Sequence, residues 1–286
     1  MGAGCPTLGA MPELEVDRRR LLAGSLAGLG AGALAAVGAP TASAAGIETR
    51  AALYAALDRY KAGRVGTIGL MLRDNRDGGY FGWHPRAMES YSTIKVLVLV
   101  ATLKRAQDRG LSLTTTQKSL ASRMIRYSDN DATDTLLAQI GVPTCQRVAD
   151  QLGLTSTVVR GGSTGWWGHS TTTPRDLVQL MNQLVLGSYL TSGRRSYVRD
   201  LMATVTSSQR WGLADPLPSG AHVELKNGWG PMSSGYRLNS FGHVSGNGRS
   251  YQLAILSRSP NGFGYGKETV NRVSRIVYDA LDRPLT

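Results

Sequence analysis

The sequence contains little cysteine and little histidine, and this excludes several kinds of stabilising centre. There are two cysteines, Cys5 and Cys145, and four histidines at scattered positions. A disulfide framework needs several cysteines, and a structural zinc site needs cysteines or histidines at close spacing. We therefore expect no disulfide network, no metal ion and no cofactor.

Long hydrophobic runs are also missing after the N-terminal region. The most apolar stretch, residues 96–103, is followed at once by Lys104 and Arg105, so it is too short for a membrane span. The formal net charge is +12, yet there is no run of basic residues and no basic patch with interleaved aromatics. This pattern argues against nucleic acid as a partner and favours anionic cell-wall polymers.

The composition is that of a globular protein with a sizeable core, because 42% of the 286 residues are hydrophobic and 18% are charged. Periodicity predicts a first helix at residues 47–61 and a last helix at residues 267–281. Strand patterns occur at residues 67–72, 80–83, 222–226, 236–244 and 251–257. Strand pairing would therefore join an early hairpin to three late strands, with a helical insertion between them.

Residues 1–44 have the features of an export signal. Three consecutive arginines at 18–20 precede a Gly/Ala-rich stretch at 23–40 and an Ala-Ser-Ala triplet that ends at Ala44. Paired arginines, a mildly hydrophobic stretch and an Ala-x-Ala site are typical of a twin-arginine signal that is cleaved. The alternative is an N-terminal membrane anchor, which the small and weakly hydrophobic residues disfavour.

Cleavage after Ala44 would leave residues 45–286 as one mature domain. Its charge would stay +12, because the signal contains three arginines and three acidic residues. Cys5 would leave with the signal, so Cys145 would have no partner and is interpreted as a packing residue. We expect the mature protein to be secreted or cell-wall associated, outside the membrane, and monomeric.

Ser92 and Lys95 stand three residues apart at the start of an apolar stretch, residues 94–103. This stretch is apolar around nearly its whole circumference, which predicts a helix buried on all sides. Residues i and i+3 share a helix face, so Lys95 can reach Ser92. Burial and the helix dipole both disfavour a charged ammonium, so Lys95 could accept the proton of Ser92. The alternative is a helix cap beside a solvated lysine.

Two further segments favour the catalytic interpretation. The tripeptide Ser-Asp-Asn at 128–130 follows a helical stretch, and Lys-Asn-Gly at 226–228 ends a short strand. Two of the few lysines, Lys95 and Lys226, fall inside the three patterns, which chance explains poorly. The only lysines are Lys61, Lys95, Lys104, Lys118, Lys226 and Lys267.

In this order the three motifs resemble those of class A β-lactamases and penicillin-binding proteins. The chain resembles this superfamily over residues 46–286, and most of all its β-lactamase-related serine hydrolase branch. The resemblance implies an α+β fold with three α/β/α layers. A five-stranded antiparallel sheet would be flanked by the terminal helices, with a helical subdomain at about residues 90–205.

The resemblance also implies catalytic roles for four residues. Ser92 would be the acylated nucleophile and Lys95 its base. Ser128 and Lys226 would relay a proton to the leaving nitrogen, and Lys226 would also attract a carboxylate of the substrate.

The remaining motif residues would bind the substrate. Asn130 would hold its side-chain amide, while Gly228 and Trp229 would belong to the strand that lines the site. The backbone N–H groups of Ser92 and Trp229 would form the oxyanion hole. Asp129 is interpreted as a brace for the loop that carries Ser128.

Three departures from class A enzymes concern deacylation and the pocket. The loop at 155–173 contains no Glu or Asp, whereas a class A loop glutamate activates the deacylating water. His169 is left as a candidate base, and the alternative is a loop histidine bonded to backbone. Asp134 replaces the asparagine that anchors the glutamate. Ser92 and Ser128 are only 36 residues apart, so one pocket wall should be missing and the cleft open.

Smaller differences affect the mouth of the cleft. Trp166, Trp167 and Trp229 either line it or pack on the edge of the sheet. Asn227 replaces the usual hydroxyl of Lys-Thr-Gly by an amide, which can still donate a hydrogen bond.

Three functions remain open from the sequence. The first is an exported active-site-serine hydrolase that acts through an acyl-enzyme on β-lactam, D-alanyl-type amide or ester substrates, which are small molecules or peptides. The second is a penicillin-binding or sensing module that is acylated with little turnover. The third is a catalytically silent protein that binds the cell wall through its positive charge.

Overall fold

The computed structural model describes the backbone of residues 42–162, 164–215 and 217–284, with side chains from residue 50 onward. The expected export signal, residues 1–44, therefore lies almost wholly outside the described residues.

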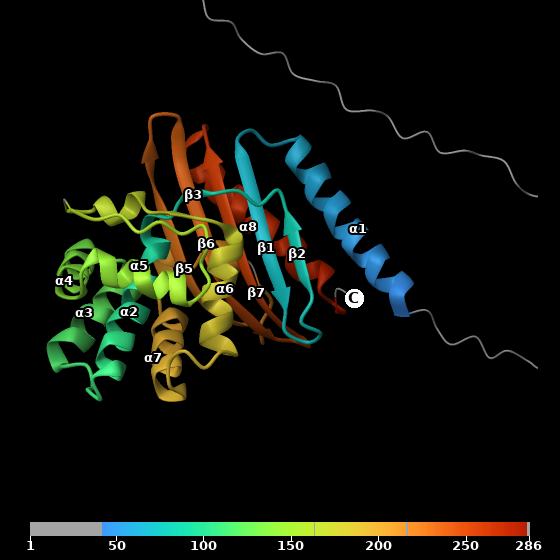
Figure 1. The fold of residues 1–286 in the computed structure, drawn as a ribbon. Coiled ribbons are helices and arrows are strands. Elements are labelled where there is room, and N and C mark those ends of the chain that lie inside the picture. The colour runs from blue at the N-terminus through green and yellow to red at the C-terminus, as the bar shows by residue number, and fades with distance from the viewer. Residues whose placement is uncertain (1–41, 163, 216, 285–286) are drawn as a thin grey trace, which may run out of the picture. The chain divides into compact units, whose positions relative to one another are not determined.

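A five-stranded antiparallel sheet forms the centre of the fold (Figure 1). Its strands are β1 (Thr67–Asp74), β2 (Tyr80–Trp83), β5 (His222–Met232), β6 (Gly235–Gly246) and β7 (Arg249–Ser259). Their order is β2-β1-β7-β6-β5, and every neighbouring pair is antiparallel. The sheet thus joins the first hairpin to the three late strands, which confirms the predicted fold class.

The two terminal helices cover one face of the sheet and lie side by side in Figure 1. They are α1 (Ala42–Ala62) and α8 (Gly262–Ala280). Leu53 and Leu57 of α1 share a buried apolar cluster with the helix α8 and with inward-facing residues of all five strands. Strands β6 and β7 are buried at nearly every central position, as expected for a sheet that is covered by helices on both faces.

Helices between β2 and β5 cover the other face. The central one, α2 (Ile94–Asp108), is buried at every position from Ile94 to Leu103, as its continuous apolar run predicted. Around it lie α3 (Thr115–Arg126), α4 (Asn130–Ile140), α5 (Val142–Gln151), α6 (Pro174–Val185) and α7 (Ser192–Ala203). A short pair of strands, β3 (Met88–Glu89) and β4 (Thr171–Thr172), ties the long loop to the segment before α2.

Strand β5 is longer than the sequence predicted. The predicted strand covered residues 222–226, but β5 pairs with β6 as far as Met232. Gly228, Gly230 and Pro231 lie within this strand, although glycine and proline generally weaken strands. Here the strand lies at the edge of the sheet, and its glycines allow close contact with the segment before α2.

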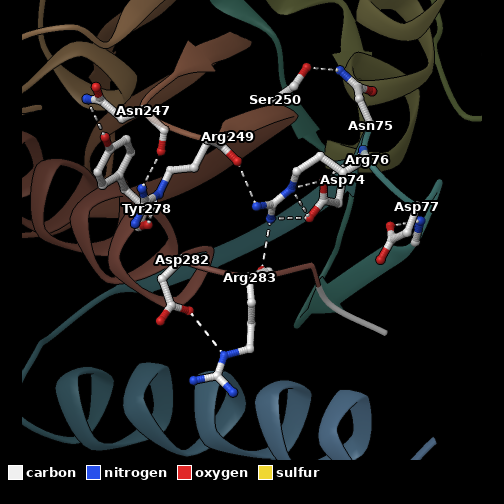
Figure 2. Close-up of polar contacts among 12 residues, drawn as sticks. Asp74, Asn75, Arg76, Asp77, Asn247, Arg249, Ser250, Tyr278, Asp282 and Arg283 are labelled. Atoms are coloured by element: carbon white, nitrogen blue, oxygen red, sulfur yellow. Dashed lines mark hydrogen bonds and ion pairs between the residues drawn. The ribbon is translucent and has the colours of Figure 1, made fainter. Parts of the chain in front are cut away.

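A buried ion pair fastens the end of the sheet away from this contact (Figure 2). Asp74 is fully buried at the end of β1, and Arg76 Nη2 lies 2.6 Å from its Oδ2. Arg76 also donates to the carbonyl oxygens of Gly248 and Arg283, each at 2.9 Å. One guanidinium therefore joins the β1–β2 turn, the β6–β7 turn and the chain after α8.

Three expectations from the sequence concerned membrane spans, metal sites and the cysteine Cys145. Among the described residues, no helix combines the length and apolarity of a membrane span, and no cluster of His, Cys, Asp and Glu could hold a metal ion. Cys145 is fully buried in α5, and burial raises the pKa of its thiol to about 12. It is therefore a packing residue, as expected.

Candidate active site

Ser92 lies in a short 3-10 turn, η1 (Tyr91–Thr93), which continues directly into α2. It is half-buried and lines a cleft of about 370 Å³ between β5, the start of α4 and the long loop. The preceding residue, Tyr91, has a φ of 47°. A bulky residue in the left-handed region is strained, and such strain concentrates at functional sites.

Lys95 is fully buried in the first turn of α2, and its amine points towards the segment after α3. Its Nζ lies 2.6 Å from Ser128 O and 2.8 Å from Asn130 Oδ1. Weaker contacts reach Ser128 Oγ at 3.2 Å and Asp129 O at 3.4 Å. Within the described structure its hydrogen bonds are all to this segment, and none is to the predicted partner Ser92.

Burial lowers the pKa of Lys95 to about 7, while the carboxylates of Asp129 and Asp134 act in the opposite direction. At neutral pH a large share of the amine is therefore uncharged. A neutral amine has two N–H donors and one lone pair. The two short contacts use both donors, so the lone pair is free to accept a proton.

Ser128 lies between the two lysines of the motifs. Its Oγ is 2.9 Å from Lys226 Nζ and 3.2 Å from Lys95 Nζ. Its φ of 59° places it in the left-handed region, and it precedes Asp129, the N-cap of α4. Asp129 accepts from Ala132 N at 2.9 Å and pairs with a guanidinium of α3, so it fixes this turn as expected.

Lys226 reaches the same hydroxyl from β5. It is fully buried, and desolvation, together with the nearby Lys95 amine, holds its pKa well below the usual range. Its other contact is Asn227 O at 3.3 Å. The structure thus joins residues 95, 128 and 226 into one chain of hydrogen bonds beside Ser92.

The backbone of β5 packs tightly against η1. A Cβ on Gly228 would lie 2.6 Å from Ser90 O and 2.8 Å from Ser92 N. A Cβ on Gly230 would lie 2.1 Å from the ring of Tyr91, whose hydroxyl donates to Pro231 O at 2.7 Å. Only glycine fits at these two points, and its absence of a side chain lets the edge strand approach Ser92.

This close packing of β5 against η1 places Ser92 and Trp229, whose N–H groups are the expected oxyanion donors, at one cleft. Ser92 and Trp229 line it together, and the N–H of Ser92 lies where η1 meets β5. The indole of Trp229 also packs edge-on against Trp211, with ring centroids 5.9 Å apart. Trp229 therefore both lines the cleft and packs on the sheet, so each interpretation of it holds in part.

Asn130 and Asn227 differ in their position relative to the cleft and in their hydrogen-bond partners. Asn130 lines the cleft and accepts from Lys95 through Oδ1. Asn227 is buried, and its Nδ2 donates to Gln209 O at 2.8 Å and Trp211 O at 3.1 Å. Both N–H donors of Asn227 are thus used by backbone carbonyls. The Asn227 amide therefore donates hydrogen bonds, as expected, and its acceptors are backbone carbonyls.

The long loop covers Lys95 with an indole. Trp167 belongs to the short turn η2 (Trp166–His169), is 4% exposed, and lies with its ring centroid 4.5 Å from Lys95 Nζ. Its Nε1 donates to Asp134 Oδ1 at 2.8 Å, and Gly165 N donates to the same oxygen at 3.2 Å. Asp134 therefore anchors the loop, although the loop has no glutamate.

His169 and Trp166, the other residues of this loop that were considered for the cleft, occupy different positions. His169 lines the cleft, with its ring 4.9 Å from Trp166 and 6.3 Å from Tyr91. Trp166 is 48% exposed and is not among the residues that line the cleft. Of the three tryptophans expected at the mouth, the structure brings Trp167 and Trp229 there.

A larger hollow of about 480 Å³ lies on the other face of the sheet, along α8. Its lining includes Lys267, Glu268 and Arg272, and the structure brings no serine or cysteine nucleophile to it. The cleft at Ser92 is smaller, but it holds a hydroxyl and two buried amines, and we assign the chemistry to it.

Sequence reasoning noticed Asp134 and Trp167 separately but missed their contact. They are 33 residues apart and meet only because the loop folds over α4. Gln209, which also lines the cleft, was not identified at all. The contact between Asp134 and Trp167 could have been suspected, because Asp134 is a carboxylate and the loop at 155–173 has none of its own. No feature of the sequence indicated that Gln209 lines the cleft.

Comparison with known proteins identifies the family of the chain and solved structures with a similar fold. A family model described as "Beta-lactamase enzyme family" matches residues 51–118 and 113–281. No curated protein matches the sequence. Similar solved structures include a class A β-lactamase representative from Bacteroides cellulosilyticus, with 18% identity, a TM-score of 0.73, and coverage of 82% of this chain and 98% of that one.

Two other structures are similarly close. A class A β-lactamase from Mycobacterium abscessus has 22% identity and a TM-score of 0.70, covering 81% of this chain and all of that one. PBP-A has 23% identity and a TM-score of 0.70, covering 82% and 96%. These likenesses show the fold, and the family match extends over most of the sequence. The chain belongs to the β-lactamase enzyme family.

Proposed function

We propose that the protein is an active-site-serine hydrolase that acts through an acyl-enzyme on β-lactam, D-alanyl-type amide or ester substrates. The observation that carries this proposal is the chain of contacts from Lys95 through Ser128 to Lys226, which runs beside Ser92 in one cleft. It supplies a nucleophile, a buried amine that is partly neutral, and a hydroxyl that can pass a proton.

Acylation begins when Ser92 Oγ attacks the carbonyl carbon of the substrate. Lys95 turns from Asn130 towards Ser92 and takes its proton, while the carbonyl becomes an oxyanion held by the N–H groups of Ser92 and Trp229. The bond to the leaving nitrogen or oxygen then breaks, and that atom receives a proton from Ser128. Ser128 recovers a proton through the amines of Lys95 and Lys226.

Deacylation must proceed without the loop glutamate. Residues 155–173 contain no carboxylate, and Trp167 covers Lys95 from the loop side. A water that attacks the acyl-enzyme would lose its proton to Lys95 or to His169, which lines the cleft. We therefore expect bulky acyl groups from penicillins to persist and small acyl groups to leave faster.

The test is pre-steady-state hydrolysis of a chromogenic penicillin and of a simple chromogenic ester. The proposal predicts a burst of about one product per enzyme with the penicillin, followed by slow turnover, and faster steady turnover with the ester. Rapid penicillin hydrolysis without a burst would contradict the account of deacylation. Absence of any Ser92-dependent reaction would reject the hydrolase.

A second candidate is a penicillin-binding or sensing module that is acylated and hardly turns over. The same absence of a loop carboxylate favours it, and a PBP-A mutant has been solved as an acyl-enzyme complex with penicillin G. Ester turnover separates the two candidates, because a sensor would be labelled by the ester but release no more than one equivalent. A wall-binding protein without catalysis would not be labelled at all.

We also propose that the protein is exported by the twin-arginine route and works outside the membrane as a monomer, where its charge of +12 would hold it near anionic cell-wall polymers. The paired arginines and the Ala-Ser-Ala triplet support this proposal. Changing Arg18, Arg19 and Arg20 to lysine should abolish secretion, whereas unchanged secretion with the same mature N-terminus would point to another route.

A further inference from the structure

The hollow of about 480 Å³ along α8 has no part in the chemistry of the cleft. Its lining on α8 recurs every three to four residues between Gly264 and Arg275. It therefore follows one face of this helix for about three turns, or roughly 16 Å. Tyr60 of α1 and Asp215 of the segment before β5 also line it. The hollow is thus a groove along α8, on the face of the sheet away from the cleft.

Two cations flank this groove without a partner. Lys267 is half-buried and Arg272 is exposed, and both belong to its lining. Five residues of an α-helix turn by about 140°, so the two side chains leave α8 on different sides of the groove. Among the residues that the structure describes, neither side chain makes a hydrogen bond or an ion pair. Both charges are therefore available to a ligand.

The carboxylates of the groove do not neutralise these two cations. Glu268 stands one turn before Arg272, but it pairs with Arg64 at 3.4 Å. Asp215 accepts through Oδ2 from Asn271 Nδ2 at 2.7 Å. Each carboxylate thus has a donor, whereas the two cations have no acceptor. An anion in the groove would complete the pairing, because charge-assisted hydrogen bonds to Lys and Arg are the strong ones.

The length of the groove indicates the kind of anion. A third cation, Arg275, lies at its far end and donates through Nε to Asp279 Oδ1 at 2.8 Å. Lys267 and Arg275 are eight residues apart, which is about 12 Å along the helix. A single phosphate group cannot reach both, but a chain of repeated phosphates can contact the cations in succession. An arginine fork and a lysine point charge both suit phosphate oxygens.

We propose that the groove along α8 binds a phosphodiester polymer through Lys267 and Arg272. The inference rests on the proposed association with anionic cell-wall polymers, and it names the site and the chemistry of that association. It does not depend on the reaction at Ser92. Because the groove and the cleft lie on different faces of the sheet, a bound polymer leaves the cleft open to substrate.

The test is isothermal titration calorimetry with two phosphate ligands. One is poly(glycerol phosphate), a phosphodiester polymer, and the other is glycerol phosphate, its monomer. The ionic strength is held at about 0.15 M, where attraction between distant exposed charges is largely screened. We expect the polymer to bind at least about tenfold more tightly per phosphate than the monomer, since several cations of the groove act on one chain.

A matched pair of double variants locates the site. Lys267→Gln combined with Arg272→Gln should weaken binding of the polymer by about tenfold or more. The control is Lys118→Gln combined with Arg147→Gln, which removes one exposed lysine of α3 and one exposed arginine of α5. It lowers the net charge equally and should weaken binding by less than about twofold. Thermal unfolding checks that both double variants are folded.

A variant with a gain of affinity completes the test, because misfolding cannot produce a gain. Asp215→Asn removes a negative charge from the wall of the groove, and an amide oxygen can still accept from Asn271. It should tighten binding of the polymer by about threefold. Asp200→Asn removes the same charge from an exposed position on α7 and should change the affinity less.

The outcomes separate the site from the general attraction. Equal weakening in the two double variants would overturn the site while leaving the association with anionic polymers intact. A monomer that binds as tightly per phosphate as the polymer would overturn the choice of a polymer. If the parent protein binds neither ligand, the proposed association is itself wrong and the inference falls with it. The hydrolase at Ser92 is tested separately by acylation.

Discussion

At the scale of single residues, Lys95 and Lys226 beside the cleft are chemically identical but have different neighbours. Both are fully buried, yet the carboxylates of Asp129 and Asp134 oppose the lowering of the pKa of Lys95. Lys226 has Lys95 beside it, which lowers its pKa further. Lys95 therefore titrates near neutral pH, where a general base is most effective, and Lys226 serves as a hydrogen-bond donor to Ser128.

The pH dependence of acylation tests the role of Lys95. Because its pKa is lowered to about 7, the neutral amine accumulates as the pH rises through this value. The acylation rate with an uncharged ester should therefore increase with pH below about 7 and become constant above it. Stopped-flow measurement of ester acylation between pH 5 and pH 9, as a rough working range around neutrality, would record this profile.

Replacing the amine completes this test. Lys95→Ala should slow acylation by about 10²–10⁴-fold, the usual contribution of a general base. Lys104→Ala changes the exposed side of the same helix, where the lysine pairs with Asp108, and should leave the rate unchanged. Near-normal acylation in Lys95→Ala would remove Lys95 from the mechanism.

At the scale of elements, the site depends on a close contact between η1 and β5. The edge strand continues past Gly228 to Met232, so its backbone passes beside Ser92 rather than turning away. The strained backbone of Tyr91 is held there by the bond from its hydroxyl to Pro231 O. Contacts on both sides of Ser92 thus hold this residue against the strand.

Gly228→Ala should disrupt this contact. The new Cβ would meet three backbone atoms of residues 90, 92 and 93 at 2.6–2.8 Å, and backbone cannot move aside as a flexible side chain can. We expect a loss of about 1–3 kcal/mol in the free energy of unfolding and a much larger loss of acylation rate. Gly193→Ala, in α7 with open space around it, should change neither quantity appreciably. Normal acylation in Gly228→Ala would show that β5 does not position Ser92.

The long loop is the second element that shapes the site, and it is held by one carboxylate. Asp134 accepts from Trp167 Nε1 and from Gly165 N, and Trp167 covers the Lys95 amine. The loop thus keeps water from Lys95 and contributes to the burial that lowers its pKa.

Asp134→Ala should release this loop. Loss of the acceptor leaves the buried indole N–H without a partner, which costs about 1–3 kcal/mol of unfolding free energy. Hydrogen exchange at the amides of the loop should become faster. Asp134→Asn keeps an acceptor oxygen and should retain most of the stability. It also removes the negative charge that raises the pKa of Lys95, so the pH profile should shift to lower pH. Equal loss of stability in both variants would contradict this account.

At the scale of the whole molecule, the order of elements could be predicted because it follows from local patterns. The strand patterns in the sequence correspond to the five strands of the sheet, and the continuous apolar run at residues 94–103 corresponds to the buried helix. The resemblance of the three motifs to a known family implied that residues 95, 128 and 226 would act together, and the structure brings them into contact.

What could not be predicted depends on tertiary contacts between distant segments. The bond between Asp134 and Trp167, and the use of the Asn227 amide by residues 209 and 211, exist only once the loops have folded onto the sheet. The amine of Lys95 was expected at Ser92 from helical spacing, but the closer partners are Ser128 and Asn130. Local periodicity carries no information on such choices.

The most direct test of the central claim is the site of covalent labelling. Incubation with penicillin G or a simple ester, followed by intact-mass analysis and peptide mapping, should place one acyl group on Ser92 and on no other residue. Ser92→Ala should not be labelled, while the exposed control Ser208→Ala should be labelled as the parent is. An adduct on another residue, or a Ser92→Ala variant that still becomes acylated, would contradict the assignment of Ser92 as the nucleophile.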